Sequence, residues 1–340
     1  MAATACWGLY ERTDQWAYRI ILIIQFLIPI VMIVGGFILP ESPRWLVRQG
    51  RAEEARKVLL LLRKDQQPAD VDAEIAHLAA AEEQQKMFSA ESTWLDCFKG
   101  PNLRRTAIAA GVQCLQNAQG NSFMANYSIL FLQAIGMTDV YRILVLLYFT
   151  NMAASGFAFY FADKIGRRPL MFVAASVMAI CMCTVAGIVT RTPTTAGQNG
   201  ALACLFIWQF VQAIGWSSCV WIVTAEVPST HLRERTVTIA TVSGFIVGVL
   251  VTYINPFMQN PGYGDLGGKV GFVYGSFSVV AAVWVALFLP EMKGRSLEEL
   301  DELFAKKVPT FRFGAYKLEG GEVVTEKVDE EQEVTITSKA

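Results

Sequence analysis

The stretch 105–132, RTAIAAGVQCLQNAQGNSFMANYSILFL, decides the fold expected of this chain. It is long enough to cross a bilayer as a helix, and it carries no charge after Arg105. Its amide and hydroxyl side chains are nevertheless numerous: Gln113, Gln116, Asn117, Gln119, Asn121, Ser122 and Asn126. Amides within a bilayer need partners, so part of this helix is expected to face protein or a wet cavity.

An uninterrupted helix would gather some of these side chains on one side. At about 100° per residue, an arc of about 100° holds Gln113, Gln116, Asn117, Gly120 and Tyr127. Gln119, Ser122 and Asn126 fall on the opposite side, where packing against another helix is expected. Gly120 is the expected place for the helix to bend or break.

The whole chain has the composition of a multispanning membrane protein. Of its 340 residues, 53% are apolar and 17% are charged, and the mean hydropathy is +0.36. Seven apolar spans of suitable length are predicted, at 18–39, 106–132, 140–162, 170–190, 201–224, 237–258 and 270–289. We therefore expect an all-α membrane protein.

The cysteines and histidines argue against a metal site and against an enzyme. Five of the seven cysteines lie inside apolar spans, at spacings that fit neither a metal site nor a disulfide framework. The two histidines, His77 and His231, lie between spans and indicate no pairing of a nucleophile with a base. No catalytic residue, no metal and no bound cofactor are expected.

The basic residues are distributed unevenly between the spans, which predicts the orientation of the chain. Of the 29 Lys and Arg residues, 24 lie in the segments 42–105, 163–169, 227–236 and 290–340. These segments are expected to be cytoplasmic, with the amino terminus outside and the carboxyl terminus inside. Within the first of them, helices are predicted at 51–63 and 70–86, and the tail after about residue 312 is expected to be disordered.

Four clusters of acids and bases occur where the spans reach the cytoplasmic side. They are Asp163 with Arg167 and Arg168, Glu226 with Arg233, Glu41 with Arg44, and Glu291 with Arg295. Any one cluster fits positive-inside charges and helix caps. Four clusters on one side together predict a switchable cytoplasmic gate.

These motifs together resemble the sugar porter family of the major facilitator superfamily, and within it the fungal maltose and α-glucoside proton symporters. The resemblance runs from about residue 7 to residue 312. It rests on WAYRI at 16–20, PESPRWLV at 40–47, QNAQGN at 116–121 with Tyr127 and Ser128, GRRP at 166–169, EVPST at 226–230 with Leu232 and Arg233, INPF at 254–257 and LDELFAKKVP at 300–309.

The resemblance implies a domain organisation. Members of the family have twelve spans, with intracellular helices between the sixth and the seventh. Here residues 1–17 would be extracellular, 18–39 the sixth family helix, 40–105 the intracellular helical domain, 106–289 the carboxyl-terminal bundle of six helices, and 290–340 the cytoplasmic tail. The resemblance thus implies that the first five family helices are absent from this chain.

The resemblance also implies a sugar-binding set on the helices that it aligns with the seventh, tenth and eleventh family helices. The set is Gln113, Gln116, Asn117, Tyr127, Trp221 and Asn255. Amides suit sugar hydroxyls, and an indole face suits the C–H face of a pyranose ring. Interhelical packing alone is the alternative for these residues. Asn117, Ser122, Ser217 and Ser218 depart from the residues usual in the family, which leaves hexose selectivity open.

The function implied is uptake of an α-glucoside such as maltose, or a related sugar, by alternating access. In proton-coupled members of the family an acidic residue of the first helix is thought to carry the coupling proton, and no Asp or Glu lies in the middle of a predicted span here. The alternatives are a sugar sensor that does not transport and an inactive truncated fragment. The expected partners are the sugar, the proton as coupling ion and the lipid bilayer of the plasma membrane, with no nucleic acid, for a monomeric protein.

Overall fold

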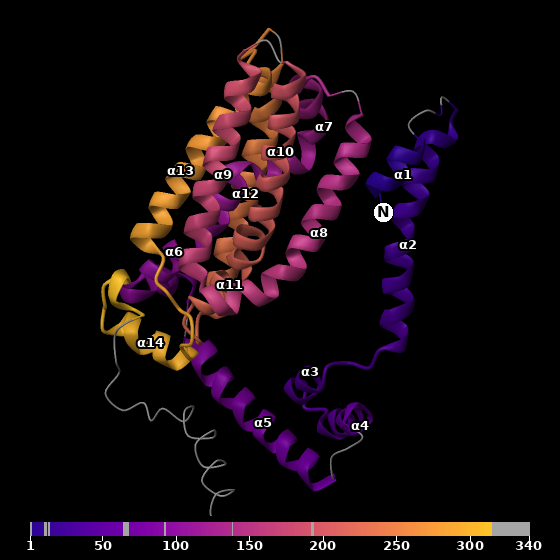
Figure 1. Ribbon diagram of the computed structural model, residues 1–340. Coiled ribbons are helices and arrows are strands. Elements are labelled where there is room, and N and C mark those ends of the chain that lie inside the picture. The colour runs from indigo at the N-terminus through magenta and orange to yellow at the C-terminus, as the bar shows by residue number, and fades with distance from the viewer. Residues whose placement is uncertain are drawn as a thin grey trace, which may run out of the picture.

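All regular secondary structure in the described part of the chain is helical (Figure 1). The computed structural model describes residues 2–9, 12, 14–63, 68–91, 93–137, 139–191, 194–260 and 262–314. The α-helices are α1 (Ala2–Leu9), α2 (Trp16–Ile38), α3 (Pro43–Arg48), α4 (Ala52–Leu62), α5 (Pro68–Glu91), α6 (Gly100–Gln116), α7 (Ser122–Ile135), α8 (Val140–Ile165), α9 (Arg167–Val189), α10 (Thr195–Gln212), α11 (Cys219–Glu226), α12 (Arg233–Gln259), α13 (Val270–Phe288) and α14 (Leu297–Ala305). The all-α membrane fold is confirmed.

Six helical stretches in the described residues are long and apolar enough to cross a membrane. They are Trp16–Ile38, Val140–Ala158, Arg167–Val189, Thr195–Glu226, Arg233–Gln259 and Gly267–Phe288. The amide-rich stretch 106–132 is not among them; a five-residue π-helical turn, η2 (Asn117–Asn121), separates α6 from α7, and Gly120 within it has non-helical backbone angles. A second π-helical turn, η3 (Ala213–Ser217), joins α10 to α11.

The helices from α6 to α13 form one bundle, and α2 stands beside it (Figure 1). In the bundle α9 packs against α13 and α10, and α12 packs against α6. The apolar core between these helices includes Trp208, Trp216 and Tyr274, all fully buried. No residue of α2 is buried, and α1 lies between α2 and α8. The bundle is therefore the part of the chain that can hold a site.

The polar segment between α2 and α6 folds into three helices that pack on one another below the bundle (Figure 1). Ion pairs join them: Arg44 of α3 lies 3.0 Å from Glu82 of α5, and Arg56 of α4 lies 2.5 Å from Asp72 of α5. The helices predicted at 51–63 and 70–86 correspond to α4 and α5. The tail after residue 314, where disorder is predicted, lies outside the described residues.

A short 3₁₀ helix, η1 (Trp94–Phe98), fixes the start of α6. Thr93 and Asp96 cap η1 reciprocally. The side chain of Lys99 and, after it, the backbone and hydroxyl of Thr93 bond to Asp96 and hold the pKa of this carboxyl well below its usual range. Thr106 of α6 donates to the carbonyl oxygen of Cys97 at 2.8 Å. The first turns of α6 are thereby tied to the segment that precedes them.

Candidate substrate groove and charged cluster

The amide-rich stretch breaks at Gly120, where the sequence predicts a bend. Gly120 has a φ of 105°, in the left-handed region where L side chains are strained. A Cβ at this position would also lie 3.2 Å from Cγ of Tyr274. The break therefore depends on glycine.

The π-helical turn changes which side chains share a face. It contains one more residue than an α-helical turn, so the side chains of α7 are rotated relative to those of α6. Ser122 and Asn126 thereby come to the same side as Asn117 and Tyr127. The expectation that Ser122 and Asn126 lie on the opposite face is wrong, because it assumed an uninterrupted helix.

These side chains and α12 border a groove of about 770 Å³. It is lined by Asn117, Ser122, Asn126, Tyr127, Phe245, Gly248, Val249, Thr252, Tyr253, Pro256 and Phe257. At Gly248 the two walls approach closely, because a Cβ there would lie 3.2 Å from Ser122 Oγ and 3.4 Å from Asn117 Oδ1. A lining of several aromatic rings with a few polar groups is typical of a site for a small organic molecule.

Two of the six expected sugar-binding residues, Asn117 and Tyr127, line this groove. Gln113 is buried and donates to Thr224 Oγ1 at 3.2 Å. Asn255 is also buried, and its Oδ1 accepts the hydroxyl hydrogen of Tyr274 at 3.1 Å. In this structure Gln113 and Asn255 join helices to one another.

The other two expected residues lie apart from the groove lining. Gln116 is buried, and its side chain makes no hydrogen bond to the residues that the structure describes. Trp221 of α11 is 51% exposed. Their assignment to the sugar remains a prediction, while Ser122, Asn126 and Thr252 join Asn117 and Tyr127 as the polar residues of the groove.

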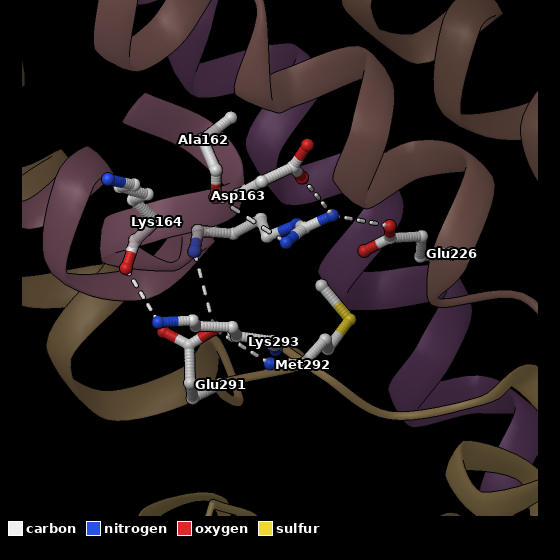
Figure 2. A network of polar contacts seen from close by, with 8 residues as sticks. Ala162, Asp163, Lys164, Glu226, Glu291, Met292 and Lys293 are labelled. Atoms are coloured by element: carbon white, nitrogen blue, oxygen red, sulfur yellow. Dashed lines mark hydrogen bonds and ion pairs between the residues drawn. The ribbon is translucent and has the colours of Figure 1, made fainter. Parts of the chain in front are cut away.

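A charged cluster joins the turn between α8 and α9 to the end of α11 (Figure 2). The guanidinium of Arg167 lies 3.0 Å from Glu226 and 3.3 Å from Asp163, and it donates to the carbonyl oxygen of Ala162 at 3.4 Å. The side chains of Arg167 and Glu226 are 12% and 28% exposed, whereas Asp163 is 77% exposed. The pair between Arg167 and Glu226 is thus the shielded part of the cluster.

Glu291, in the segment after α13, caps the start of α9 (Figure 2). Its carboxylate accepts from the backbone N–H groups of Arg167 at 3.3 Å and Arg168 at 3.2 Å. It also accepts from the N–H groups of Met292 at 3.0 Å and Lys293 at 2.9 Å. A carboxylate at a helix amino terminus is favourable both as a cap and for the helix dipole.

Gly166 makes this cap possible. It joins α8 to α9 with a φ of 98°, and a Cβ there would lie 2.7 Å from Glu291 Oε2. A side chain at position 166 would therefore be strained and would also displace the carboxylate. The turn, the cap and Arg167 form one unit, which we call the Arg167 cluster: Asp163, Gly166, Arg167, Glu226 and Glu291.

The remaining expected gate residues lie outside the Arg167 cluster. Arg168 donates to the carbonyl oxygen of Ala286 at 2.7 Å, and Arg295 lies 3.6 Å from Glu299. Arg44 pairs with Glu82, and Glu41 is exposed before α3. Arg233, at the start of α12, has buried Nε and Nη2 atoms without a partner among the described residues. Of the nine expected gate residues, the structure joins Asp163, Arg167, Glu226 and Glu291 directly, with the backbone of Arg168.

The contact between α14 and α6 was not predicted from the sequence. Arg105 is buried, forms an ion pair with Asp301 of α14 and lies 4.4 Å over the ring of Phe304. Asp301 also accepts from Thr230 in the loop before α12 at 3.2 Å. The tandem arginines 104–105 and the LDELF motif were the available signals, but neither says which partner the other has.

Replacing Glu291 with Ala should destabilise the protein measurably. Four backbone N–H groups would lose their acceptor, and loss of a cap costs about 1–2 kcal/mol. We expect the melting temperature of the purified protein in detergent to fall by roughly 1–3 °C. Glu298→Ala, which removes an exposed carboxylate of α14, is the matched control and should change it little. Equal melting temperatures for the two variants would contradict the capping role.

Comparison with known proteins gives one family throughout. The family model described as "Sugar (and other) transporter" matches residues 1–304. The general alpha-glucoside permease of Saccharomyces cerevisiae is 29% identical over 304 residues, which span 88% of this chain and 49% of the permease. The maltose permease MAL61 of the same organism is 30% identical over 312 residues, spanning 90% of this chain and 50% of that protein. The chain spans about half the length of these permeases.

A sensor and solved structures also match. The high glucose sensor RGT2 of Saccharomyces cerevisiae is 30% identical over 311 residues, spanning 88% of this chain and 40% of the sensor. The major facilitator superfamily proton:xylose symporter XylE, bound to 6-bromo-6-deoxy-D-glucose, aligns with a TM-score of 0.68 at 21% identity, over 89% of this chain and 63% of XylE. The inward open conformation of XylE from E. coli aligns with a TM-score of 0.69 at 20% identity, over 89% of this chain and 61% of XylE. At this identity the likeness to XylE concerns the fold.

Proposed function

The chain belongs to the "Sugar (and other) transporter" family and has the fold of the major facilitator superfamily, and on that premise we propose that the intact protein carries a sugar across the membrane. The proposed substrate is an α-glucoside such as maltose, or a related sugar. The similarity to a general alpha-glucoside permease and to a maltose permease supports this substrate class. Movement of two bundles about a central site, by alternating access, is the proposed mechanism.

The groove between α7 and α12 is the single observation that carries the proposal for this chain. Its volume of about 770 Å³ lies in the range of sites for small organic ligands. Asn117, Ser122 and Thr252 offer polar atoms to sugar hydroxyls, while the rings of Tyr253 and Phe257 suit the C–H face of a pyranose. Gln116 and Trp221 are proposed to join the site when the bundles close.

The Arg167 cluster is proposed to lie on the cytoplasmic side and to take part in the gate there. The excess of Lys and Arg in the segments at this end supports the orientation. A shielded ion pair between two helix ends is a contact that can be exchanged for another when helices move. The plasma membrane is the proposed location and a monomer the proposed state.

Proton coupling is proposed from the relatives alone. The likeness in fold is to a proton:xylose symporter, and the similarity to the permeases supports the proposed substrate class. In the six apolar stretches of the described residues, Asp and Glu occur only near the ends, at positions such as Glu226 and Glu234. We therefore assign site residues of this chain to sugar binding and to the gate, and none to the coupling proton.

Uptake of radiolabelled maltose tests the proposed function. The protein is expressed from its native gene in cells that lack sugar carriers of their own, and surface expression is measured in parallel. We expect uptake that saturates with maltose and falls when the proton gradient is collapsed. Binding of maltose to the purified protein without uptake would favour the alternative function, a sugar sensor. The similarity to the high glucose sensor RGT2 is the observation behind this alternative. The proposal would be overturned if the protein neither bound nor took up any sugar.

A further inference from the structure

The groove has a hydrogen-bonding polarity that its residue types do not reveal. Its lining side chains with described hydrogen bonds are Asn117, Ser122, Asn126, Tyr127 and Thr252. Each of these residue types has both donor hydrogens and acceptor oxygens. The bonds that they make inside the protein decide which of the two remains for a ligand.

Asn117 and Ser122 use their donors internally. The side-chain amide of Asn117 donates to the carbonyl oxygen of Gln113 at 3.1 Å and to that of Gly244 at 3.0 Å. The hydroxyl of Ser122 donates to Asn117 Oδ1 at 2.8 Å. Because carbonyl oxygens only accept, the direction of each bond is fixed. Oxygen lone pairs are what these two side chains leave for a ligand.

The side-chain donors on the wall formed by α7 and α12 are likewise used in hydrogen bonds within the protein. Pro256 has no N–H, so the carbonyl oxygen of Thr252 lacks its helical partner, and the hydroxyl of Tyr127 donates to it at 3.0 Å. The hydroxyl of Thr252 donates to the carbonyl oxygen of Gly248 at 2.9 Å. The amide of Asn126 donates to the carbonyl oxygen of Ser122 at 2.8 Å and to Thr252 Oγ1 at 3.5 Å.

We propose that this groove binds a neutral polyhydroxylated ligand whose hydroxyls act as hydrogen-bond donors, and that it rejects anionic sugars. The inference rests on the proposed function and specifies the ligand of the same site. A ligand that presents only acceptors would leave itself and the groove oxygens unsatisfied, which is unfavourable when both are desolvated. A sugar phosphate or a sugar acid adds negative charge to such a lining and meets no donor there except the hydroxyl of Tyr253.

Two other features of the lining favour a sugar over a cation. The described lining residues include no carboxylate, so a metal ion or an ammonium group would lack a counter-charge. The apolar part, with Phe245, Val249 and Phe257, suits the C–H face of a pyranose ring. Tyr253, 68% exposed, is the one lining hydroxyl without a hydrogen-bond partner among the described residues, and it serves as an internal control.

Deoxy and deoxyfluoro sugars test this polarity, because fluorine accepts a hydrogen bond weakly but never donates one. Analogues of methyl α-D-glucoside, altered at one hydroxyl at a time, compete with radiolabelled maltose for the purified protein. At the hydroxyls that the groove holds, the deoxy analogue should bind about fivefold more weakly for each lost bond, and the fluoro analogue should bind as weakly as the deoxy one. Sugar phosphates should not compete with maltose, and sodium or potassium ions should not occupy the groove and displace it.

The variant Ser122→Asn provides the complementary result, because it introduces an amide donor at the groove. In this variant the fluoro analogue at one position should recover affinity relative to its deoxy partner. Ser176→Asn, on the exposed face of α9, is the matched control and should leave the ratio of fluoro to deoxy affinity unchanged. Tyr253→Phe should leave that ratio unchanged as well, which excludes its hydroxyl as a hidden donor.

The outcomes separate the inference from the function on which it rests. Equal losses for fluoro and deoxy analogues in the unaltered protein support the inference. Fluoro analogues that bind as well as the parent sugar, wherever the deoxy analogue is weak, would overturn it while leaving sugar transport intact. Competition by a sugar phosphate would overturn it too. If the purified protein bound no parent sugar, the proposed function itself would fail.

Discussion

Replacing Arg167 with Gln, or Glu226 with Gln, should reduce sugar uptake roughly tenfold or more while the protein still reaches the membrane. The two side chains are 3.0 Å apart and largely shielded, at 12% and 28% exposure. Removing one charge leaves the other without its partner, at a cost of about 1–3 kcal/mol. A gate that loses this pair loses much of the preference for the arrangement that the pair stabilises.

The size of the effect should follow the shielding of each acid around Arg167. Asp163 lies 3.3 Å from Arg167 but is 77% exposed, and exposed ion pairs contribute about 0–1 kcal/mol. Asp163→Asn should therefore reduce uptake less than Glu226→Gln. Glu302→Gln removes an exposed pair with Lys306 on α14 and serves as the control, with uptake close to that of the unaltered protein.

Surface-labelled protein and initial uptake rates measure this prediction together. Reduced uptake must be found with normal surface amounts, because a fall in both would indicate a folding defect. Normal uptake in both the Arg167→Gln and the Glu226→Gln proteins would refute the gating role of the cluster.

The helices and the break at Gly120 could be predicted from the sequence because they depend on local features. Hydropathy and length mark the spans, and an uncharged stretch with one glycine among amides marks the break. The Arg167 cluster could be anticipated in part for a similar reason. Asp163, Arg167 and Arg168 are close in the sequence, and Glu226 lies at the end of a predicted span on the same side of the membrane. Helical periodicity predicts which side chains share a face only where the helix is regular.

The polar face of the groove could not be predicted, because it depends on irregular backbone. Ser122 and Asn126 share the side of Asn117 only because the π-helical turn rotates α7. Tyr127 bonds to Thr252 across helices because Pro256 frees that carbonyl oxygen. Neither the extra residue of a turn nor the partner of a freed carbonyl is visible in a pattern of apolar positions.

The attachment of α14 was hidden for a different reason. The partners Arg105 and Asp301 are 196 residues apart, and a tandem of arginines beside a span also fits the positive-inside rule. Arg104 likewise reaches Val308 at 2.9 Å and Thr310 at 2.7 Å. Only the packed bundle shows that these arginines hold the segment after α13 against α6.

Filling the groove should have the largest effect on sugar binding. Gly248 allows α12 to lie close to Ser122 and Asn117, and a larger side chain there would cover the oxygens of both. We expect Gly248→Leu to weaken maltose binding roughly 100-fold, since it combines steric overlap with the loss of several hydrogen bonds. Gly248→Ala should give a smaller loss, because its Cβ would lie 3.2 Å from Ser122 Oγ.

Gly156→Leu is the matched control for this substitution. Gly156 lies on α8, and a Cβ there would meet nothing within 4 Å. The melting temperature of each purified variant shows whether the bundle remains folded. Because the control makes the same exchange of residue types on a free helical face, it separates the effect of filling the groove from the effect of losing a glycine.

The most direct measurement of the central claim, that this groove is the sugar site, is the dissociation constant of maltose for the unaltered, Gly248→Leu and Gly156→Leu proteins. We expect a loss of roughly 100-fold for Gly248→Leu and unchanged binding for Gly156→Leu. If a folded Gly248→Leu protein bound maltose as tightly as the unaltered protein, this groove would not be the sugar site.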